Sequence, residues 1–242
     1  MDIKETSGGL HCINPKFLKL QVEKSRRNLE LNTIDLLYLH NPYEMQSTYM
    51  SQDKFLTELH KIFEFFEQLV QNNLIKQYGL ATSTCFRSPP EMHQAHLNLQ
   101  KIVHIAEAVG GPQHHFKFIE VPINIAMPEA LIYPWQSIDP NPAMKDNSSL
   151  VLLAAANRLR MNLVGCQPLY QGKVIQLKLK EMGLEDLGAR HLQLMRSIPA
   201  RCLITTLVGM KTMRHTMSNL EVAKLDPLGS ALFAQTIKGI SM

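Results

Sequence analysis

The strongest constraint on the fold is a regular alternation between two kinds of apolar pattern. Short apolar runs typical of buried strands alternate with longer stretches in which apolar residues recur at helical spacing. The predicted strands cover residues 34–39, 75–81, 116–123, 162–166 and 202–208. Because these runs recur at intervals of about 40 residues, they are typical of consecutive βα units in a parallel sheet.

Two of the helical stretches carry well-defined apolar stripes. The first and narrower stripe contains Leu18, Val22 and Leu29, with Asn14 as the predicted N-cap and Pro15 in the first turn. The second and stronger stripe consists of Phe55, Leu59, Ile62, Phe66 and Leu69. Further helices are predicted at residues 91–109, 149–161, 181–195, 212–224 and 228–237.

A sheet of this kind either closes as a (β/α)8 barrel or stays open as a doubly wound sheet. The barrel is favoured because neither glycine-rich phosphate motif, G-x-G-x-x-G or G-x-x-x-x-G-K-[ST], follows a predicted strand. A barrel needs eight strands, whereas five are predicted and the first recognisable element is a helix. We therefore predict an incomplete α/β TIM barrel, a single domain over residues 1–242 that lacks the first three βα units.

Composition and charge exclude several classes of protein. Hydrophobic residues make up 45% and charged residues 19% of the chain, as in an ordinary globular protein. The net charge of +4 is small and scattered, which argues against nucleic-acid binding. The longest apolar run, residues 150–156, is far shorter than the ~20 residues of a membrane span, and the charged start does not resemble a signal peptide.

The cysteines and histidines do not form the usual metal-binding patterns. No two of the four cysteines form a Cys-x-x-Cys pair, and three of them lie in or beside apolar runs. Buried free thiols are therefore expected, which favours a reducing compartment and predicts a cytoplasmic protein. His93, His96 and His104 are expected near one face of a predicted helix, where solvated side chains are more common than zinc ligands. No metal site is predicted.

Five groups of residues, in order along the chain, resemble one known family. They include GGLHC at 8–12 with IDLLYLHNP at 34–42, IKQYGLAT at 75–82, FIEVPIN at 118–124, QPLYQG at 167–172 and LVGMK at 207–211. Together they are similar to the aldo-keto reductase superfamily from its third helix onward. The resemblance implies a barrel that reduces an aldehyde or ketone with hydride from NADPH.

The resemblance implies a catalytic role for His40, at the end of its strand. A neutral imidazole there can donate to the carbonyl oxygen and orient the substrate. The family's catalytic tyrosine, aspartate and lysine come from strands that are not predicted here, so the proton donor is expected to be absent. Lys4 follows no predicted strand, and Tyr43 is expected to pack at the barrel mouth rather than to replace the donor.

The resemblance also implies an altered NADP(H) site. The residues it assigns to the cofactor are Thr82, Glu120, Pro168, Leu169, Gly172, Gly209, Lys211, Arg214 and Asn219. Thr82 and Glu120 correspond to the carboxamide contacts, and Glu120 replaces a glutamine, so it accepts but cannot donate when ionised. Lys211 and Arg214 begin the last barrel helix, where they either select the 2′-phosphate of NADPH or form a solvated basic turn.

Three interpretations stay open. The chain is a reductase-family protein whose catalysis requires a further N-terminal segment, a non-catalytic protein that keeps a barrel face for NADP(H) or a protein partner, or a divergent enzyme that uses His40 with an unrelated donor. Whether NADP(H) binding survives also stays open. Exposed edges of an incomplete barrel also predict self-association and low stability. The carbonyl substrate cannot be read, because a barrel fold does not fix a reaction.

Overall fold

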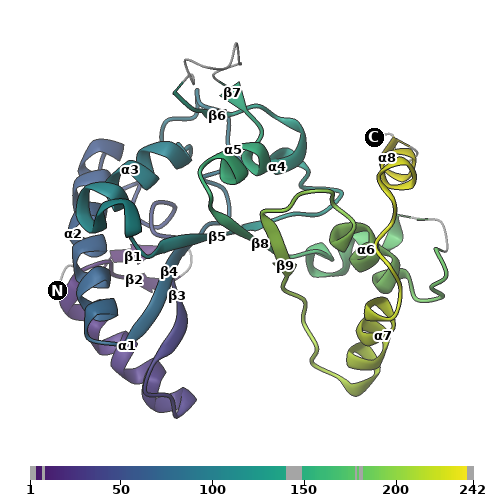
Figure 1. The fold of residues 1–242 in the computed structure, drawn as a ribbon, viewed down its shortest axis with the longest axis horizontal. Coiled ribbons are helices and arrows are strands. Elements are labelled where there is room, and N and C mark those ends of the chain that lie inside the picture. Colours follow the sequence, from purple (N-terminus) through teal and green to yellow (C-terminus); the bar gives the residue numbers. More distant parts are fainter. Residues whose placement is uncertain (1–3, 7–8, 140–148, 178, 180–181, 239–242) are drawn as a thin grey trace.

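The centre of the molecule is a parallel sheet of five strands in the order β3-β4-β5-β8-β9 (Figure 1). The computed structural model describes residues 4–6, 9–139, 149–177, 179 and 182–238. The strands of the sheet are β3 (Ile34–His40), β4 (Ile75–Ala81), β5 (Phe116–Pro122), β8 (Asn162–Cys166) and β9 (Leu203–Thr206). Each strand lies on a predicted apolar run, so the α/β class with about five parallel strands is confirmed.

Strand register brings the carboxyl ends of the strands to one edge of the sheet. His40 pairs with Ala81, and Ala81 pairs with Glu120. Gly79 allows close packing between strands, because a Cβ there would lie 2.8 Å from the Tyr38 ring and would clash with the Phe118 carbonyl oxygen. Tyr38, Gly79 and Phe118 therefore share one face of the sheet, and Glu120 shares it by alternation along β5. We call this the inner face.

Helices pack on the opposite, outer face, where α2 (Gln52–Gln71) contacts β4 and α5 (Leu152–Arg158) contacts β8. The other helices are α1 (Pro15–Leu29), α3 (Leu99–Gly110), α4 (Glu129–Ile132), α6 (Leu187–Arg196), α7 (Met213–Ala223) and α8 (Ser230–Lys238), with 3-10 turns η1 (Gly111–Gln113) and η2 (Tyr170–Gln176). The Phe63 ring of α2 lies 5.1 Å from that of Tyr78 and 5.0 Å from that of Phe116. These aromatic contacts join α2 to β4 and β5.

The first two long helices begin and pack largely as predicted. The Asn14 side chain accepts a hydrogen bond from the Lys16 amide at 2.9 Å, and Pro15 is the first residue of α1. All five residues of the strong stripe in α2 are buried. The narrow stripe of α1 is only partly buried: Val22 is inside, whereas Leu29 at the end of the helix is 58% exposed.

The prediction that the first element is a helix is wrong. A short antiparallel hairpin, β1 (Lys4–Thr6) with β2 (Gly9–His11), precedes α1 and is separate from the main sheet. Lys4 therefore lies on a strand, which the sequence did not predict. A second small antiparallel pair, β6 (Gln136–Ser137) with β7 (Ser149–Leu150), occupies the start of the helix predicted at 149–161. That helix is reduced to α5.

The helix predicted at 91–109 begins only at Leu99, where Asn98 caps it through a 3.0 Å hydrogen bond from the Lys101 amide. The preceding residues form turns, because tertiary contacts hold them: the Leu97 amide donates to the Cys85 carbonyl at 2.8 Å, and the His96 ring bonds to the Ser88 carbonyl at 2.8 Å. His93 and His96 thus lie before α3, not on it.

Most buried residues belong to one core that runs from Ile13 to Cys202. A second, smaller core under α6 and α7 consists of Leu184, Ala189, Leu192 and Val222. All four cysteines are free thiols, three of them buried, as predicted. β3 and β9 are the two outer strands, and within the described residues neither pairs with a strand on its outer side.

Candidate active site

Three predicted site residues meet at the carboxyl ends of β3, β4 and β5. His40 ends β3, Thr82 follows β4 directly, and Glu120 lies on β5. The Thr82 amide donates to the Glu120 carbonyl at 2.9 Å, which holds the two residues side by side. The His11 ring lies 3.2 Å from the His40 carbonyl oxygen, so the β1–β2 hairpin contacts the end of β3. The imidazole of His40 is exposed at this edge.

Of these three residues, Thr82 gives the clearest indication of a missing ligand. Its side chain is 3% exposed, and among the described residues its hydroxyl oxygen is buried without a hydrogen-bond partner. An unpaired buried hydroxyl costs on the order of 1–3 kcal/mol. A ligand amide would satisfy it, so Thr82 fits the carboxamide role implied by the sequence.

Burial raises the pKa values of two neighbouring groups on the inner face, Glu120 and Cys166. Burial raises the pKa of Glu120, while the neighbouring Cys166 thiol and His40 act in the opposite direction. Burial, with Glu120 adding to it, raises the pKa of Cys166 to about 12. Cys166 is therefore a neutral thiol within hydrogen-bond reach of the Glu120 carboxylate, not an activated nucleophile. This pair could not be predicted from the sequence, because the two residues are distant along the chain.

The loop after β8 contains the predicted pyrophosphate residues. Pro168 is buried, and Leu169 packs against the small core under α6 and α7. Gln171 and Gly172 have φ values of 56° and 87°. This left-handed conformation suits glycine and strains Gln171. Such strain is more common in functional loops than in ordinary connections.

An extended connection carries α7 away from the end of β9 (Figure 1). The Thr212 side chain caps α7 by accepting from the His215 amide at 3.2 Å, so Lys211 precedes the cap and Arg214 follows it. Asn219 lies 3.5 Å from the Gly209 carbonyl. Within the described residues, neither Lys211 nor Arg214 makes a hydrogen bond or an ion pair with the loop that contains Gly172.

Comparisons with known proteins found similarities in sequence and in fold. Residues 4–101 match the aldo/keto reductase family. No curated protein matches the chain significantly. Among solved structures, a thermostable aldo-keto reductase in complex with the inhibitor epalrestat has a TM-score of 0.62 at 14% identity over 95% of this chain and 68% of its own.

Two further structures are similar to the same extent. An aldo-keto reductase from Bacillus halodurans, in its holo form, has a TM-score of 0.60 at 16% identity over 96% of this chain and 69% of its own. One from Klebsiella pneumoniae in complex with NADPH has a TM-score of 0.59 at 14% identity over 92% of this chain and 64% of its own. Residues 4–101 are therefore similar in sequence to the aldo/keto reductase family, and the fold of the chain is similar to that of these solved aldo-keto reductases. At such identities the structures establish the fold alone, and five strands over about two thirds of their length fit an incomplete barrel.

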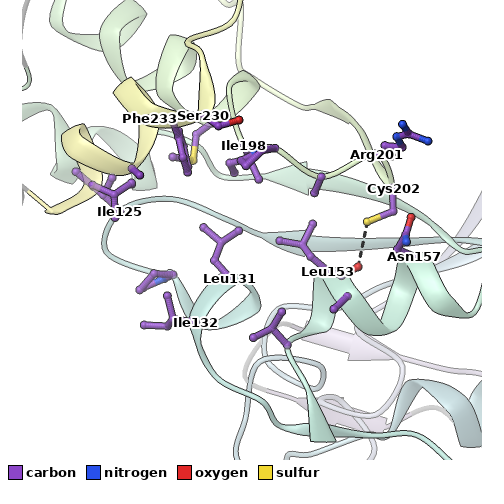
Figure 2. Close-up of a pocket in the computed structure, with 18 of the residues that line it drawn as sticks. Ile125, Leu131, Ile132, Leu153, Asn157, Ile198, Arg201, Cys202, Ser230 and Phe233 are labelled. Carbon is purple, nitrogen blue, oxygen red and sulfur yellow. Dashed lines mark hydrogen bonds between the residues drawn. The ribbon is translucent and has the colours of Figure 1, made fainter. Parts of the chain in front are cut away.

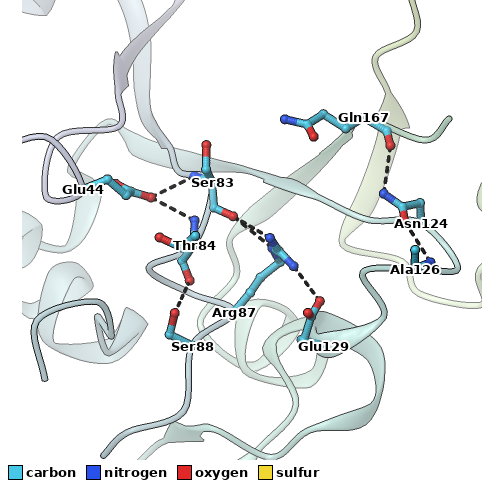
Figure 3. A network of polar contacts seen from close by, with 9 residues as sticks. All are labelled: Glu44, Ser83, Thr84, Arg87, Ser88, Asn124, Ala126, Glu129 and Gln167. Atoms are coloured by element: carbon cyan, nitrogen blue, oxygen red, sulfur yellow. Dashed lines mark hydrogen bonds and ion pairs between the residues drawn. The ribbon is translucent and has the colours of Figure 1, made fainter. Parts of the chain in front are cut away.

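A polar network at the mouth of this reductase-like sheet was not predicted (Figure 3). One oxygen of Glu44 accepts from the Ser83 and Thr84 amides at 2.8 and 3.0 Å. The Arg87 guanidinium donates to the Ser83 carbonyl and pairs with Glu129 at 2.5 Å. The network thus joins the loops that follow β3, β4 and β5.

Asn124 connects the loop after β5 to the loop after β8. Its side-chain amide donates to the Gln167 carbonyl at 3.0 Å, and its oxygen accepts from the Ala126 amide at 2.9 Å (Figure 3). The motif containing Asn124 was visible in the sequence, but its partner is 43 residues away. Four loops at the active-site end are therefore held together by side chains.

Two tyrosines lie close to His40 in the chain, and neither has the environment of a proton donor. Tyr43 is 2% exposed, packs on Phe55 and donates its hydroxyl to the His93 carbonyl at 3.1 Å. This confirms its expected packing role. Tyr38 lies on the inner face, where burial and then Glu120 and Cys166 raise its pKa. A raised pKa makes a poorer general acid near neutral pH.

Lys4 pairs with His11 in the β1–β2 hairpin. Its ammonium lies 5.3 Å from the centre of the Tyr49 ring. Among the described residues, no three His, Cys, Asp or Glu side chains gather as a metal site would require. No helix in the described part of the chain is long and apolar enough to span a membrane.

Proposed function

We propose that this chain carries the carbonyl-polarising and nicotinamide-facing parts of an aldo-keto reductase site without its proton donor. The ancestral reaction is NADPH-dependent reduction of an aldehyde or ketone. The observation that supports the proposal is the grouping of exposed His40, unsatisfied Thr82 and half-buried Glu120, beside tyrosines with raised pKa or an engaged hydroxyl. By itself, the chain therefore reduces no carbonyl compound at a rate typical of the family.

The chemistry explains why the missing group matters. NADPH, when bound, supplies hydride to the carbonyl carbon, and the oxygen then needs a proton. His40 donates a hydrogen bond to that oxygen and orients it, but it does not replace an acid matched to the reaction. Loss of general acid catalysis costs about 10²–10⁴-fold. Poorer positioning on an open inner face lowers the rate further.

The test is NADPH oxidation by the purified chain with a panel of aldehydes, quinones and ketones, with His40→Ala as control. We expect no turnover above the background of the control. Robust turnover that His40→Ala abolishes would refute the proposal and favour a divergent enzyme with an unrelated donor. Activity that appears only when a segment carrying the family's first strands is supplied would support it.

The cofactor side has its own test. Thr82 and Glu120 would hold the carboxamide, and Lys211 with Arg214 would hold the 2′-phosphate. We expect NADPH to bind more tightly than NADH, and the double variant Lys211→Gln/Arg214→Gln to narrow the difference. Lys54→Gln, which removes one charge from α2 at an exposed position, is the control. Equal titration curves for the two cofactors in the unmodified chain would contradict the assignment.

Binding without turnover is the second candidate function. It is favoured by the Thr82 hydroxyl and by the cations Lys211 and Arg214, which have no hydrogen-bond or ion-pair partner among the described residues and need no proton donor to act. A chain that binds NADPH tightly and fails the turnover assay would be a nicotinamide- or protein-binding remnant of the barrel.

The remaining parts of the proposal concern the chain as a whole. We propose a single domain over residues 1–242, which the main core from Ile13 to Cys202 supports. The four free thiols support a cytoplasmic location. The two open strand edges and the exposed apolar side chains of α7 support self-association and argue for low stability in isolation.

A further inference from the structure

A cavity of about 810 Å³ lies between α4 and α5 on one side and α8 with the α6–β9 loop on the other (Figure 2). Its volume is in the range of ~300–1,000 Å³ that is usual for small-molecule sites. None of its lining residues belongs to the predicted catalytic or cofactor set. It is therefore a separate feature of the molecule.

The body of the cavity is apolar. Ile125, Leu131, Leu153, Ile198 and Phe233 are among the side chains that face it in Figure 2. Most of these are branched aliphatic chains, which suit a flexible hydrocarbon better than a flat polar ring.

Two polar groups in the lining are already satisfied. Asn124 uses its amide with Gln167 and Ala126. The Cys202 thiol donates to the Leu153 carbonyl at 3.3 Å. Apart from Ser230 on α8, the interior thus presents little that could bind a polar ligand, and a hydrocarbon would be favoured there.

One end of the cavity differs. Arg201 and Asn157 lie close together there, beside Cys202 (Figure 2). Arg201 is exposed, and in the part of the chain that the structure describes it has no ion-pair partner. The Asn157 side chain likewise makes no hydrogen bond within those residues. A cation and a free amide at the end of an apolar cavity suit an anionic head group.

We propose that this cavity binds a long-chain aliphatic carboxylate. The carboxylate lies at the Arg201 and Asn157 end, and the hydrocarbon chain extends past Leu153 toward Ile125 and Phe233. The proposal commits to an amphipathic small molecule because the lining combines one charged end with a continuous apolar body. It does not depend on the reductase chemistry proposed above.

Calorimetric titration of the full chain with octanoate, decanoate and dodecanoate tests the apolar part. We expect a single site, and affinity that rises by roughly fourfold for each added methylene, as hydrocarbon burial predicts. Dodecanol, which has the same chain and no charge, should bind more weakly than dodecanoate. No binding, or affinity independent of chain length, would overturn the proposal.

Two variants on α8 form a matched pair. Ala234 lines the cavity and is exposed, whereas Ala231, one turn earlier, is exposed and does not line it. Ala234→Phe should weaken dodecanoate binding by about tenfold or more, and Ala231→Phe should leave it within twofold. Equal losses in the two variants would contradict the site. Because both positions are exposed, the chain is expected to fold in each case, which circular dichroism would verify.

A second pair of variants tests the charged end of the cavity. Arg201→Gln should weaken dodecanoate by about fivefold or more and leave dodecanol unchanged, whereas Lys54→Gln should change neither. Equal weakening of both ligands by Arg201→Gln would overturn the head-group assignment. A concentration-dependent dimer that Ala234→Phe disrupts, in a chain that binds no dodecanoate, would show instead that a second copy fills the groove.

Discussion

Two regions of this chain differ in how extensively their apolar side chains are packed and buried. The aromatic body, defined as β3, β4, β5, α2 and α3, contains Phe63, Phe66, Tyr78 and Phe116 with ring centres 5.0–5.9 Å apart. The α6–α7 unit, defined as those two helices, residues 184–186 before α6 and the connection from β9, has four buried apolar residues of its own. On its outside, Met213 is 76% and Met217 is 54% exposed.

The two halves of the proposed site lie on these two different regions. His40, Thr82 and Glu120 are positioned by strands of the aromatic body. Lys211 and Arg214 lie on the α6–α7 unit, which is held mainly by its small core and by Arg196 of α6, whose guanidinium donates to the Leu225 carbonyl at 2.6 Å. The geometry near the carbonyl is thus better fixed than the geometry near the cofactor phosphates.

The largest expected effect is on the core of the aromatic body. Phe63 is 0% exposed, so Phe63→Ala should lower the free energy of unfolding by about 3–5 kcal/mol. In a chain with open sheet edges, this is enough to unfold much of the population. Met213→Ala, on the α6–α7 unit, should change it by no more than ~0.5 kcal/mol. Urea denaturation monitored by circular dichroism compares the two variants. Similar losses of unfolding free energy would contradict the difference between the aromatic body and the α6–α7 unit.

Loss of the Arg87–Glu129 pair should have the next largest effect. The side chains are 10% and 25% exposed, so Arg87→Met leaves a partly buried carboxylate without its partner. Allowing for solvent at Glu129, we expect a loss of about 1–3 kcal/mol. The double variant Arg87→Met/Glu129→Leu should recover part of this loss. If the double variant is no more stable than the single one, the pair is not the cause.

Acid should destabilise the fold moderately. Burial lowers the pKa values of His11, His96, His114 and His191 below 6.5. The unfolded chain then binds more protons than the folded chain, so this stability is present above pH 6.5 and is lost as the pH falls through the folded values. Glu120, whose pKa is raised, acts oppositely: its contribution is lost as the pH rises from 4.5 through its folded value.

The urea midpoint at pH 7.5, 6.5 and 5.5 measures this effect. We expect it to fall over that range, and His96→Gln to flatten the fall more than the exposed control His93→Gln does. A midpoint that does not change with pH would contradict the assignment of buried neutral histidines.

The smallest expected change in folding free energy is at the surface of α7. Met213→Lys with Met217→Lys should alter stability by less than about 1 kcal/mol but reduce self-association, because it places charge on the exposed apolar stripe. Met92→Lys, at a position 55% exposed near α3, is the control. Sedimentation velocity distinguishes them, and an equal reduction in the control would mean that α7 is not the contact surface.

The sequence predicted the sheet well because its strands are buried on the helical side. Apolar runs marked all five strands, and the periodic stripe of α2 matched its buried face. β9 is shorter than its run of 202–208, because an outer strand continues only while its one neighbour pairs with it. The β1–β2 hairpin was missed because two three-residue strands carry no periodicity.

Contacts between residues that are far apart in the chain could not be predicted from the sequence. The start of α3 depends on Leu97 pairing with Cys85, and the mouth of the sheet depends on Arg87 pairing with Glu129. The neighbourhood of Glu120 also depends on Cys166 from another strand. In each case the residues are visible in the sequence, and only the fold brings them together.

Amide hydrogen exchange, resolved by segment, tests the central claim most directly. The proposed lack of a complete site depends on a sheet whose inner strands β4, β5 and β8 are paired on both sides, while the outer strands β3 and β9 of the described sheet each have one open edge. We predict slow exchange in β4 and β5, set by global unfolding, and much faster exchange in β9 and at the outer edge of β3. Slow exchange in all five strands, persisting on dilution to concentrations at which the chain is monomeric, would contradict the account.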